Sequence, residues 1–188
     1  YLLINLNFRE QKITAEIINC TNQEKEIVYA VPGHPMVAEK TVHKITGQLS
    51  AEEYEVIAAP SFLDAIFTSL EIDPIACMQV IDGLDFTARD LTPGVTTIIT
   101  QVYNQAVASE VKLKLMEVYP DEFEIKVIRG AGLAEEKLAV VSLYKLDRLD
   151  WIDHLTSVYL PAQPANSTQF TRLVEIMERL RGDNGCPW

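Results

Sequence analysis

Short apolar runs alternate with amphipathic stretches along this chain, and the alternation predicts a mixed α/β fold. The first run, Ile27–Val31, is apolar throughout, which is typical of a strand buried on both faces of a parallel sheet. The sequence Pro-Gly-His-Pro at 32–35 ends this run, and apolar residues then recur near helical spacing over 36–46. We therefore expect a strand, a tight turn and a helix in succession, with Gly47 as the C-cap of the helix.

The other apolar runs extend the same alternation in both directions. A helix is expected within residues 1–25, with Phe8 and Ile13 on a shared apolar face. Further strands are predicted at 54–59, 78–81, 95–102, 123–128, 138–144 and 155–160, and further helices at 62–70, 106–119 and from 168 onward. No helical stretch separates 123–128 from 138–144, so these two strands are expected to be antiparallel neighbours.

Two of the strand-to-helix turns are candidates for a small-molecule site, because ligands of open α/β sheets bind at the carboxyl ends of the strands. Gly33 lets a ligand approach the backbone, while the flanking prolines hold the loop in one shape. In the second turn, Ser61 stands at a helix N-cap, with Asp64 completing an approximate capping box. An ordinary connection and a plain capped helix explain the same residues, so both interpretations stay open at this point.

The chain divides most naturally at a polar stretch, residues 83–94, which ends in Thr-Pro-Gly. We expect a first lobe over 1–85 and a second lobe over 86–160. Residues 161–188 are expected to form a linker followed by the opening helix of something else, because 161–167 is rich in proline, alanine and polar residues.

Charge and hydropathy narrow the function classes. The 188 residues carry a formal net charge of -11 and no long basic run, which argues against a nucleic-acid partner because phosphate binding needs a positive face. No stretch of about 18 uncharged apolar residues is present, so we expect no membrane association. We expect no signal peptide, and because the chain opens and closes in mid-pattern we expect it to be an interior piece of a longer product.

Metal-ligating residue types do not form a recognisable site. The three cysteines, Cys20, Cys77 and Cys186, fit no zinc or disulfide pattern, and this indicates a reducing, cytoplasmic location. Asp147, Asp150 and Asp153 lack companion ligands and are expected to form a solvated acidic loop. The sequence therefore predicts no metal site.

Four separated motifs resemble the tetrapyrrole methylase family, in its MazG-linked branch. They are Val-Tyr-Ala-Val-Pro-Gly-His-Pro-Met-Val-Ala-Glu-Lys-Thr-Val at 28–42, Ala-Pro-Ser-Phe-Leu-Asp-Ala-Ile-Phe at 59–67, Gln-Val-Tyr-Asn-Gln-Ala-Val-Ala-Ser-Glu-Val-Lys-Leu at 101–113, and Leu-Asp-Arg-Leu-Asp at 146–150. Residues 173–188, which end in Gly-Asp-Asn-Gly-Cys-Pro-Trp, resemble the opening of a MazG nucleotide pyrophosphohydrolase domain. The motifs occur in the order found in such fusion proteins.

The resemblance implies a tetrapyrrole methylase-like α/β fold, with two α/β lobes and a ligand cleft between them that holds S-adenosylmethionine. The family's N-terminal strand and its glycine-rich turn are missing from this chain. Gly33, His34 and Val37 are implied to contact the methionine end or the sulfonium region. Ser61 and Phe62 are implied to lie beside the amino-acid part of the donor.

The second lobe is implied to supply the rest of the donor site. Val102 and Tyr103 would come from its first strand, and Ala131, Gly132, Leu155 and Thr156 would frame the adenine through backbone groups. No catalytic residue is assigned, because a sulfonium is already an activated methyl donor and the protein mainly aligns the reactants and excludes water. A base role for His34 stays open.

Three functions remain compatible with the sequence. The first is an S-adenosylmethionine-dependent methyltransferase domain acting on a small molecule, of which a tetrapyrrole is the family's example. The second is a non-catalytic ligand-binding or dimerisation module that serves the attached pyrophosphohydrolase. The third is a structural lobe without a ligand. The family also implies a homodimer, and the acidic net charge disfavours a polycarboxylate acceptor unless the cleft is locally basic.

Overall fold

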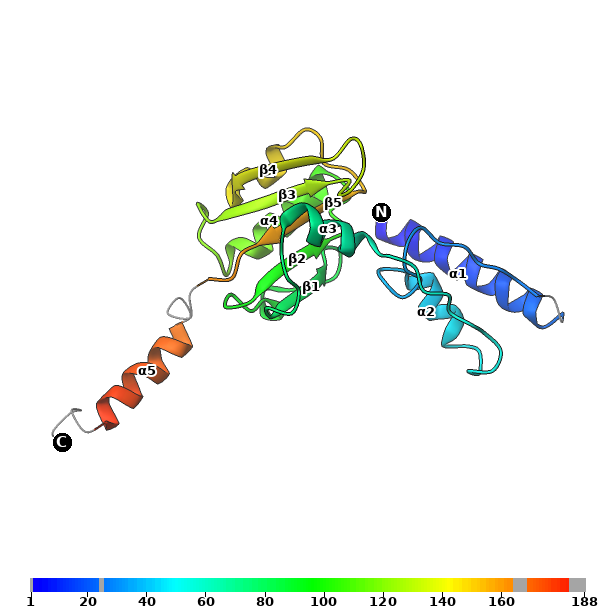
Figure 1. Cartoon of the computed structure of the whole chain (residues 1–188), viewed down its shortest axis with the longest axis horizontal. Coiled ribbons are helices and arrows are strands. Elements are labelled where there is room, and N and C mark those ends of the chain that lie inside the picture. The colour runs from blue at the N-terminus through cyan, green and yellow to red at the C-terminus, as the bar shows by residue number, and fades with distance from the viewer. Residues whose placement is uncertain (1, 24–25, 164–168, 183–188) are drawn as a thin grey trace. The chain divides into compact units, whose positions relative to one another are not determined.

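The computed structural model describes residues 2–23, 26–163 and 169–182, and the chain within it divides into two compact units, residues 1–65 and 66–188. Figure 1 labels the helices and strands. The sequence-based boundary between the two lobes, near residue 85, stays a prediction. No helix in the described ranges is long and apolar enough to cross a membrane.

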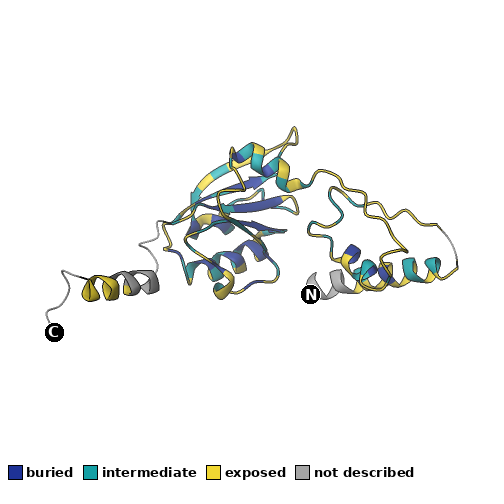
Figure 2. Ribbon diagram, turned by 60° about the horizontal axis from the view of Figure 1, so that its bottom comes forward, coloured by how far each residue is buried: buried dark blue, intermediate teal, exposed yellow. Residues whose placement is uncertain are grey.

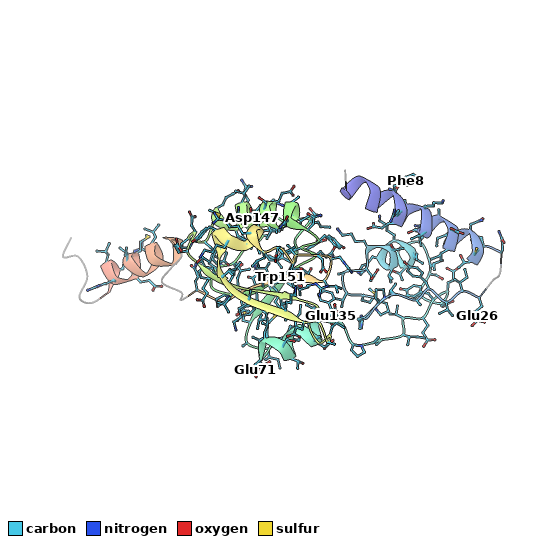
Figure 3. The ribbon with its side chains drawn as sticks, turned by 90° about the horizontal axis from the view of Figure 1, so that it is seen from above. Phe8, Glu26, Glu71, Glu135, Asp147 and Trp151 are labelled. Atoms are coloured by element: carbon cyan, nitrogen blue, oxygen red, sulfur yellow. The ribbon has the colours of Figure 1, made fainter. Side chains whose placement is uncertain are left out.

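The first unit is built on two packed helices, α1 (Leu2–Thr21) and α2 (Lys40–Thr46). Thr14 of α1 is buried, whereas Phe8 is 67% exposed (Figure 3). The expected apolar face at Phe8 and Ile13 is therefore not the buried side of this helix. An ion pair between Lys44 Nζ and Glu10 Oε2, at 2.6 Å, joins α2 to α1.

Helix α2 begins later than the sequence pattern predicts. It starts at Lys40, because Ala38 has a positive φ of 59° and interrupts the right-handed backbone before it. Gly47 is its C-cap, as predicted, and its N–H donates to the His43 carbonyl at 3.0 Å. Gly47 has a φ of -68°, which is right-handed. It therefore caps the helix through its backbone hydrogen bond and does not use the left-handed conformation that glycine often adopts at this position.

The strands predicted at 26–31 and 54–59 are not formed. Both segments are extended but irregular, and neither belongs to a ladder within the described ranges. Their apolar side chains face solvent, with Val28 87% and Ile57 75% exposed. A strand exists only when a neighbour completes its backbone hydrogen bonds, and these two apolar runs have the composition of strands without that pairing.

Helix α3 (Phe62–Leu70) follows the second extended segment and leads into the second unit. There, a five-stranded sheet has the order β1-β2-β5-β3-β4. Its strands are β1 (Met78–Asp82), β2 (Thr96–Thr100), β3 (Glu124–Arg129), β4 (Lys137–Ser142) and β5 (Thr156–Leu160). The β1–β2 pair is parallel and the other pairs are antiparallel, which confirms the predicted antiparallel pairing of β3 with β4.

The core of the second unit lies between one face of this sheet, helix α4 (Gln105–Met116) and the short 3-10 helix η2 (Leu143–Arg148) (Figure 2). Because side chains alternate along a strand, every second residue of the central strands points into this layer. The fully buried members are Ile99, Val102, Ala108, Val111, Leu115, Ile125, Val127, Leu143, Leu146, Val158 and Leu160. Asn104 caps α4 by accepting the Val107 N–H at 3.0 Å, so this polar residue fixes where the helix begins.

Two further elements complete the described structure. The 3-10 helix η1 (Ala88–Asp90) lies in the connection between β1 and β2, where Thr87 and Asp90 form a capping box. Helix α5 (Gln169–Arg181) is the last element. The sequence predicted this helix, and several of its apolar side chains are exposed.

Candidate functional site

In the first unit, the loop at 32–38 is folded around His34. The His34 carbonyl accepts the Val37 N–H at 3.0 Å, and its Nδ1 accepts the Met36 N–H at 3.1 Å. Because Nδ1 is an acceptor, a neutral His34 carries its proton on Nε2. The imidazole therefore helps to shape the loop, and only Nε2 is left to face a ligand.

Gly33 brings this loop against the turn before α3. Its φ is +90°, a conformation that side chains other than glycine rarely adopt. A Cβ built on Gly33 would lie 3.5 Å from the Pro60 carbonyl oxygen and 3.9 Å from the Ser61 Cα. Gly33 also lines a groove of about 690 Å³ whose walls include the two extended segments. The structure thus places Gly33 and Ser61, which are 28 positions apart in sequence, side by side.

Ser61 starts α3 as the sequence predicted. The Asp64 Oδ2 accepts the Ser61 N–H at 2.6 Å and the Ser61 hydroxyl at 3.0 Å, while Ser61 Oγ accepts the Leu63 N–H at 3.2 Å. The hydrogen bonds from the Ser61 backbone and side chain hold the pKa of Asp64 below its ordinary value. The only hydroxyl proton of Ser61 is therefore committed to Asp64, and Phe62, which is 38% exposed, offers an apolar surface beside it.

In the second unit, the segment after β2 turns sharply. Gln101 has a positive φ of 60°, which ends the strand at Thr100 rather than at residue 102 as predicted. Val102 is fully buried, and its N–H donates to the Thr156 carbonyl at 3.2 Å. Tyr103 Oη donates to Gln101 Oε1 at 3.0 Å. Val102 and Tyr103 therefore lie just beyond β2, and not within the strand as predicted.

Two more loops converge on the same end of the sheet. The Gly130 N–H after β3 donates to the Leu155 carbonyl at 3.1 Å, just before β5. Gly130 and Gly132 have positive φ values of 63° and 75°, so the Gly-Ala-Gly turn needs both glycines. Thr156 is buried, whereas Leu155 is 40% exposed. The backbone thus brings the predicted positions Val102, Ala131, Gly132, Leu155 and Thr156 into one neighbourhood.

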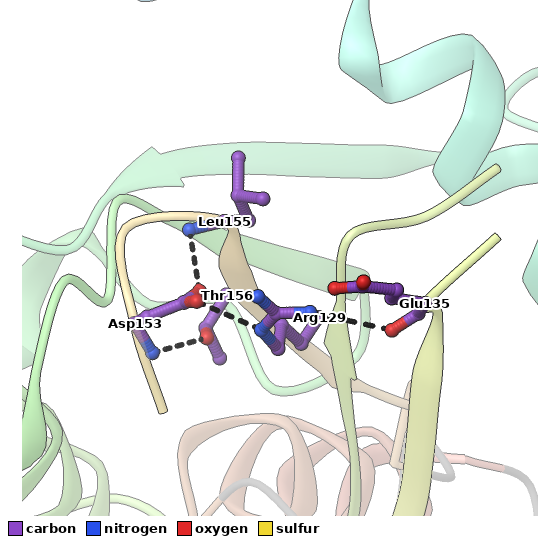
Figure 4. Close-up of polar contacts among 5 residues, drawn as sticks. All are labelled: Arg129, Glu135, Asp153, Leu155 and Thr156. Carbon is purple, nitrogen blue, oxygen red and sulfur yellow. Dashed lines mark hydrogen bonds and ion pairs between the residues drawn. The ribbon is translucent and has the colours of Figure 1, made fainter. Parts of the chain in front are cut away.

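An ion pair lies at the base of these loops (Figure 4). Arg129 Nε donates to Asp153 Oδ2 at 2.8 Å, and Asp153 Oδ1 accepts the Leu155 N–H at 2.9 Å. Burial alone would raise the pKa of Asp153, but the Leu155 N–H and the Arg129 guanidinium together hold that pKa below its ordinary value. Beside this pair lies a hollow of about 550 Å³, whose lining includes Glu135 and Trp151 (Figure 3).

Sequence reasoning missed this polar network. The expectation that Asp147 and Asp153 belong to a solvated acidic loop is wrong, because each carboxylate pairs with a cation. Lys112 Nζ lies 2.5 Å from Asp147 Oδ2, and Arg129 binds Asp153. The available signal was Arg129 itself, since a cation directly before a Gly-Ala-Gly turn has to find a carboxylate partner when it is partly buried.

The candidate positions fall into two groups on different units. Gly33, His34, Val37, Ser61 and Phe62 gather in the first unit, and the other six positions gather in the second. Their assignment to a donor molecule stays a prediction. No cluster of histidine, cysteine and carboxylate side chains that could hold a metal ion occurs in the parts of the chain that the structure describes.

Sequence comparison identifies relatives over most of the chain. A sequence model of the tetrapyrrole (corrin/porphyrin) methylases matches residues 5–147. The uncharacterized protein YabN of Bacillus subtilis (strain 168) is 43% identical over 179 residues, and the match covers 93% of this chain and 37% of YabN. The chain therefore spans well under half the length of this curated relative.

Solved structures share the fold at low sequence identity. Cobalt precorrin-4 methyltransferase, CbiF, matches with a TM-score of 0.59 at 12% identity over 82% of this chain and 72% of that chain. Uroporphyrin-III C-methyltransferase from Thermus thermophilus, complexed with S-adenosylhomocysteine, matches with a TM-score of 0.58 at 15% identity over 81% and 73%. Diphthine synthase matches with a TM-score of 0.58 at 16% identity over 88% and 69%. These likenesses show the mixed α/β fold alone. The match of the family model to residues 5–147 shows that the chain belongs to the tetrapyrrole (corrin/porphyrin) methylase family.

Proposed function

We propose that this chain is an S-adenosylmethionine-binding methyltransferase domain. The observation that carries the proposal is the convergence of the loops at 101–103, 129–132 and 153–156, joined by the bonds from Val102 N to Thr156 O and from Gly130 N to Leu155 O. Of the residues in these loops, the family resemblance assigns Ala131, Gly132, Leu155 and Thr156 to the adenine of the donor, and Val102 and Tyr103 to the donor site without naming the part they contact. One solved structure of the same fold is a complex with S-adenosylhomocysteine, which supports the choice of donor.

The proposed methyl transfer needs no catalytic acid, base or nucleophile from the protein, because the sulfonium is already an activated donor. An electron pair of the acceptor attacks the methyl carbon of the sulfonium, the carbon–sulfur bond breaks, and its electron pair stays on sulfur to give S-adenosylhomocysteine. Aligning the reactants and excluding water lowers the barrier for such a transfer. Gly33 and Phe62 would shape the methionine end, and the glycine-rich turn at 130–132 would admit the adenine to the backbone.

A tetrapyrrole is the acceptor that we propose, because the family match extends over residues 5–147. Such an acceptor carries carboxylates, whereas two partly buried cations of the second unit, Lys112 and Arg129, are already paired with Asp147 and Asp153. Acceptor binding would therefore depend on other groups, and an acceptor screen has to include tetrapyrroles with fewer free carboxylates.

The test is a calorimetric titration of S-adenosylhomocysteine into the full-length protein. We expect micromolar binding in the wild type and none in Gly33→Trp, since the indole would fill the space beside Pro60 and Ser61. The matched control is Gly94→Trp, because nothing lies within 4 Å of a Cβ at Gly94. A folded wild-type protein that binds no S-adenosylhomocysteine contradicts the methyltransferase proposal. It favours instead a non-catalytic module that serves the attached pyrophosphohydrolase.

A second proposal concerns the end of the chain. We propose that α5 opens a MazG-type pyrophosphohydrolase domain. We also propose, from the family resemblance, that the protein is a cytoplasmic homodimer. The apolar side chains Leu173, Ile176, Met177 and Leu180 recur at helical spacing and are 44% to 53% exposed, which supports the packing of α5 against further protein. Release of pyrophosphate from nucleoside triphosphates by the full-length protein tests the pyrophosphohydrolase, and its absence contradicts it. Analytical ultracentrifugation tests the dimer.

A further inference from the structure

Arg129, the last residue of β3, bonds to both of the loops that meet at this end of the sheet (Figure 4). Its Nε donates to Asp153 Oδ2 at 2.8 Å, and its Nη1 donates to the Glu135 carbonyl oxygen at 3.3 Å. Asp153 opens the turn before β5, and Glu135 lies at the far end of the loop between β3 and β4. One guanidinium therefore spans the two loops, and its side chain is only 19% exposed.

Asp153 connects Arg129 to the turn before β5 through its own hydrogen bonds. Its Oδ1 accepts the Leu155 N–H at 2.9 Å, while its own N–H donates to Thr156 Oγ1 at 3.0 Å. The Thr156 N–H returns a bond to the Asp153 carbonyl at 3.0 Å. One carboxylate oxygen therefore holds Leu155 and the other holds Arg129, so Asp153 connects Arg129 to the turn.

The loop on the other side is also fixed. Glu136 Oε2 accepts the Gly132 N–H and the Ser69 hydroxyl, both at 2.7 Å. These two bonds hold the pKa of Glu136 below its ordinary value. The Gly130 N–H bonds across to the Leu155 carbonyl. The loop is thus ordered before any ligand arrives, and Arg129 is the side chain that links it to Asp153.

We propose that Arg129, acting through Asp153, is a positioning residue that sets the spacing between the loop at 130–132 and the turn at 153–156 for the adenosine part of the donor. The inference rests on the proposed function. A planar guanidinium with several fixed N–H donors can bridge two acceptors at once, which a lysine cannot reproduce. When the two loops already have the spacing that the ligand requires, binding does not have to order them, and its entropic cost is smaller.

The experiment compares variants of the full-length protein by calorimetric titration with S-adenosylhomocysteine and with 5′-methylthioadenosine, which lacks the amino-acid end. We expect Arg129→Met to weaken both ligands by the same factor, about tenfold or more, and Arg129→Lys to restore part of the loss. Lys112→Met is the matched control, because it removes an ion pair of similar burial from α4 and η2. It should lower the melting temperature and leave both affinities within about twofold.

The outcomes separate the two proposals. If the wild type binds and Arg129→Met binds as tightly as the wild type, the positioning role is wrong and the donor site stands. If Lys112→Met weakens binding as much as Arg129→Met, the effect is one of general stability and the positioning role is again wrong. If the folded wild type binds neither ligand, the proposed function fails and this inference fails with it. Should Arg129→Met not fold, Asp153→Asn carries the same test, since it keeps an acceptor for Leu155 and loses the charge that faces Arg129.

Discussion

At the residue scale, Gly33 and Gly83 are required for different physical reasons. Gly33 has a φ of +90°, and an added Cβ would meet its nearest atom at an ordinary 3.5 Å, so its conformation excludes other residues. Gly83, at the end of β1, has no positive φ, but a Cβ there would lie 2.6 Å from the Thr100 carbonyl oxygen. The Gly83 N–H donates to that same oxygen at 2.9 Å, so the close approach is part of the pairing between β1 and β2.

We therefore expect Gly83→Ala to lower the free energy of unfolding by about 1–3 kcal/mol, because the methyl group forces the two backbones apart. Gly94→Ala is the control, since nothing lies within 4 Å of its Cβ, and it should change the free energy of unfolding by less than about 1 kcal/mol. Denaturant unfolding of both variants measures the difference. Equal free energies of unfolding for the two would show that the β1 end adapts without cost.

At the element scale, ion pairs join α4 to the 3-10 helix η2, and β3 to the turn before β5, in the second unit. Lys112 of α4 binds Asp147 of η2, with side chains 17% and 20% exposed. This ion pair adds a polar contact between two helices whose Leu115, Leu143 and Leu146 belong to the same apolar core. Burial alone would raise the pKa of Asp147, but the hydrogen bond and charge of Lys112 hold that pKa below its ordinary value. The pair therefore contributes more to stability when the carboxyl is ionised.

This shift predicts a direction for the pH dependence. The pKa of the Asp147 carboxyl is about 3.9 in the unfolded chain and lower in the folded one, so the unfolded chain binds the proton first as the pH falls. The contribution of the pair is present above about pH 4 and is lost as the pH falls through the folded pKa. We expect melting temperatures measured between about pH 5 and pH 3 to fall less steeply in Asp147→Asn than in the wild type.

Lys112→Met should flatten the same pH profile, and the double variant should add little to either single change, because both remove one interaction. A double variant whose profile is flattened by the sum of the two single effects would show that Lys112 is not the cause of the low Asp147 pKa.

At the scale of the whole molecule, the two units differ in how much apolar surface they bury. In the first unit, the buried apolar side chains among the described residues are Val42 and Ile45, each 7% exposed. In the second unit, a single cluster joins the sheet, α4 and η2, and most of its members are fully buried. Local opening costs the least free energy where few apolar contacts and few backbone hydrogen bonds have to break.

Amide hydrogen exchange should therefore separate the two units. We expect the amides of β2, β3 and β5 to exchange slowest, and those of 26–31 and 54–59 to exchange at nearly the rate of an unstructured peptide, because these segments belong to no ladder. Exchange followed by mass spectrometry on the intact chain measures both. Protection at 26–31 equal to that of β5 would instead favour the strands that the apolar pattern predicts.

Much of the second unit could be predicted from sequence because its signals are local and agree with each other. The β-branched run before Gln101 specifies β2, and the apolar stripe over 106–119 specifies α4. The failure at 26–31 and 54–59 has the opposite cause. Apolar composition indicates that a segment is compatible with a strand. Whether the strand forms depends on hydrogen bonds to a neighbouring strand that is remote in sequence.

The sequence by itself determined the family and the main helices and strands of the second unit, since each depends on residues close together in the chain. The donor-site positions that it proposes stay a prediction. Only the tertiary structure decided that Gly130 bonds to Leu155, that Val102 bonds to Thr156, and that Arg129 is held by Asp153. These contacts join residues 24 to 54 positions apart. The local pattern predicted the pairing of β3 with β4, which are consecutive in sequence, but it does not encode the pairing of β5 with the more distant β2 and β3. The sheet order, which places β5 between β2 and β3, brings them together.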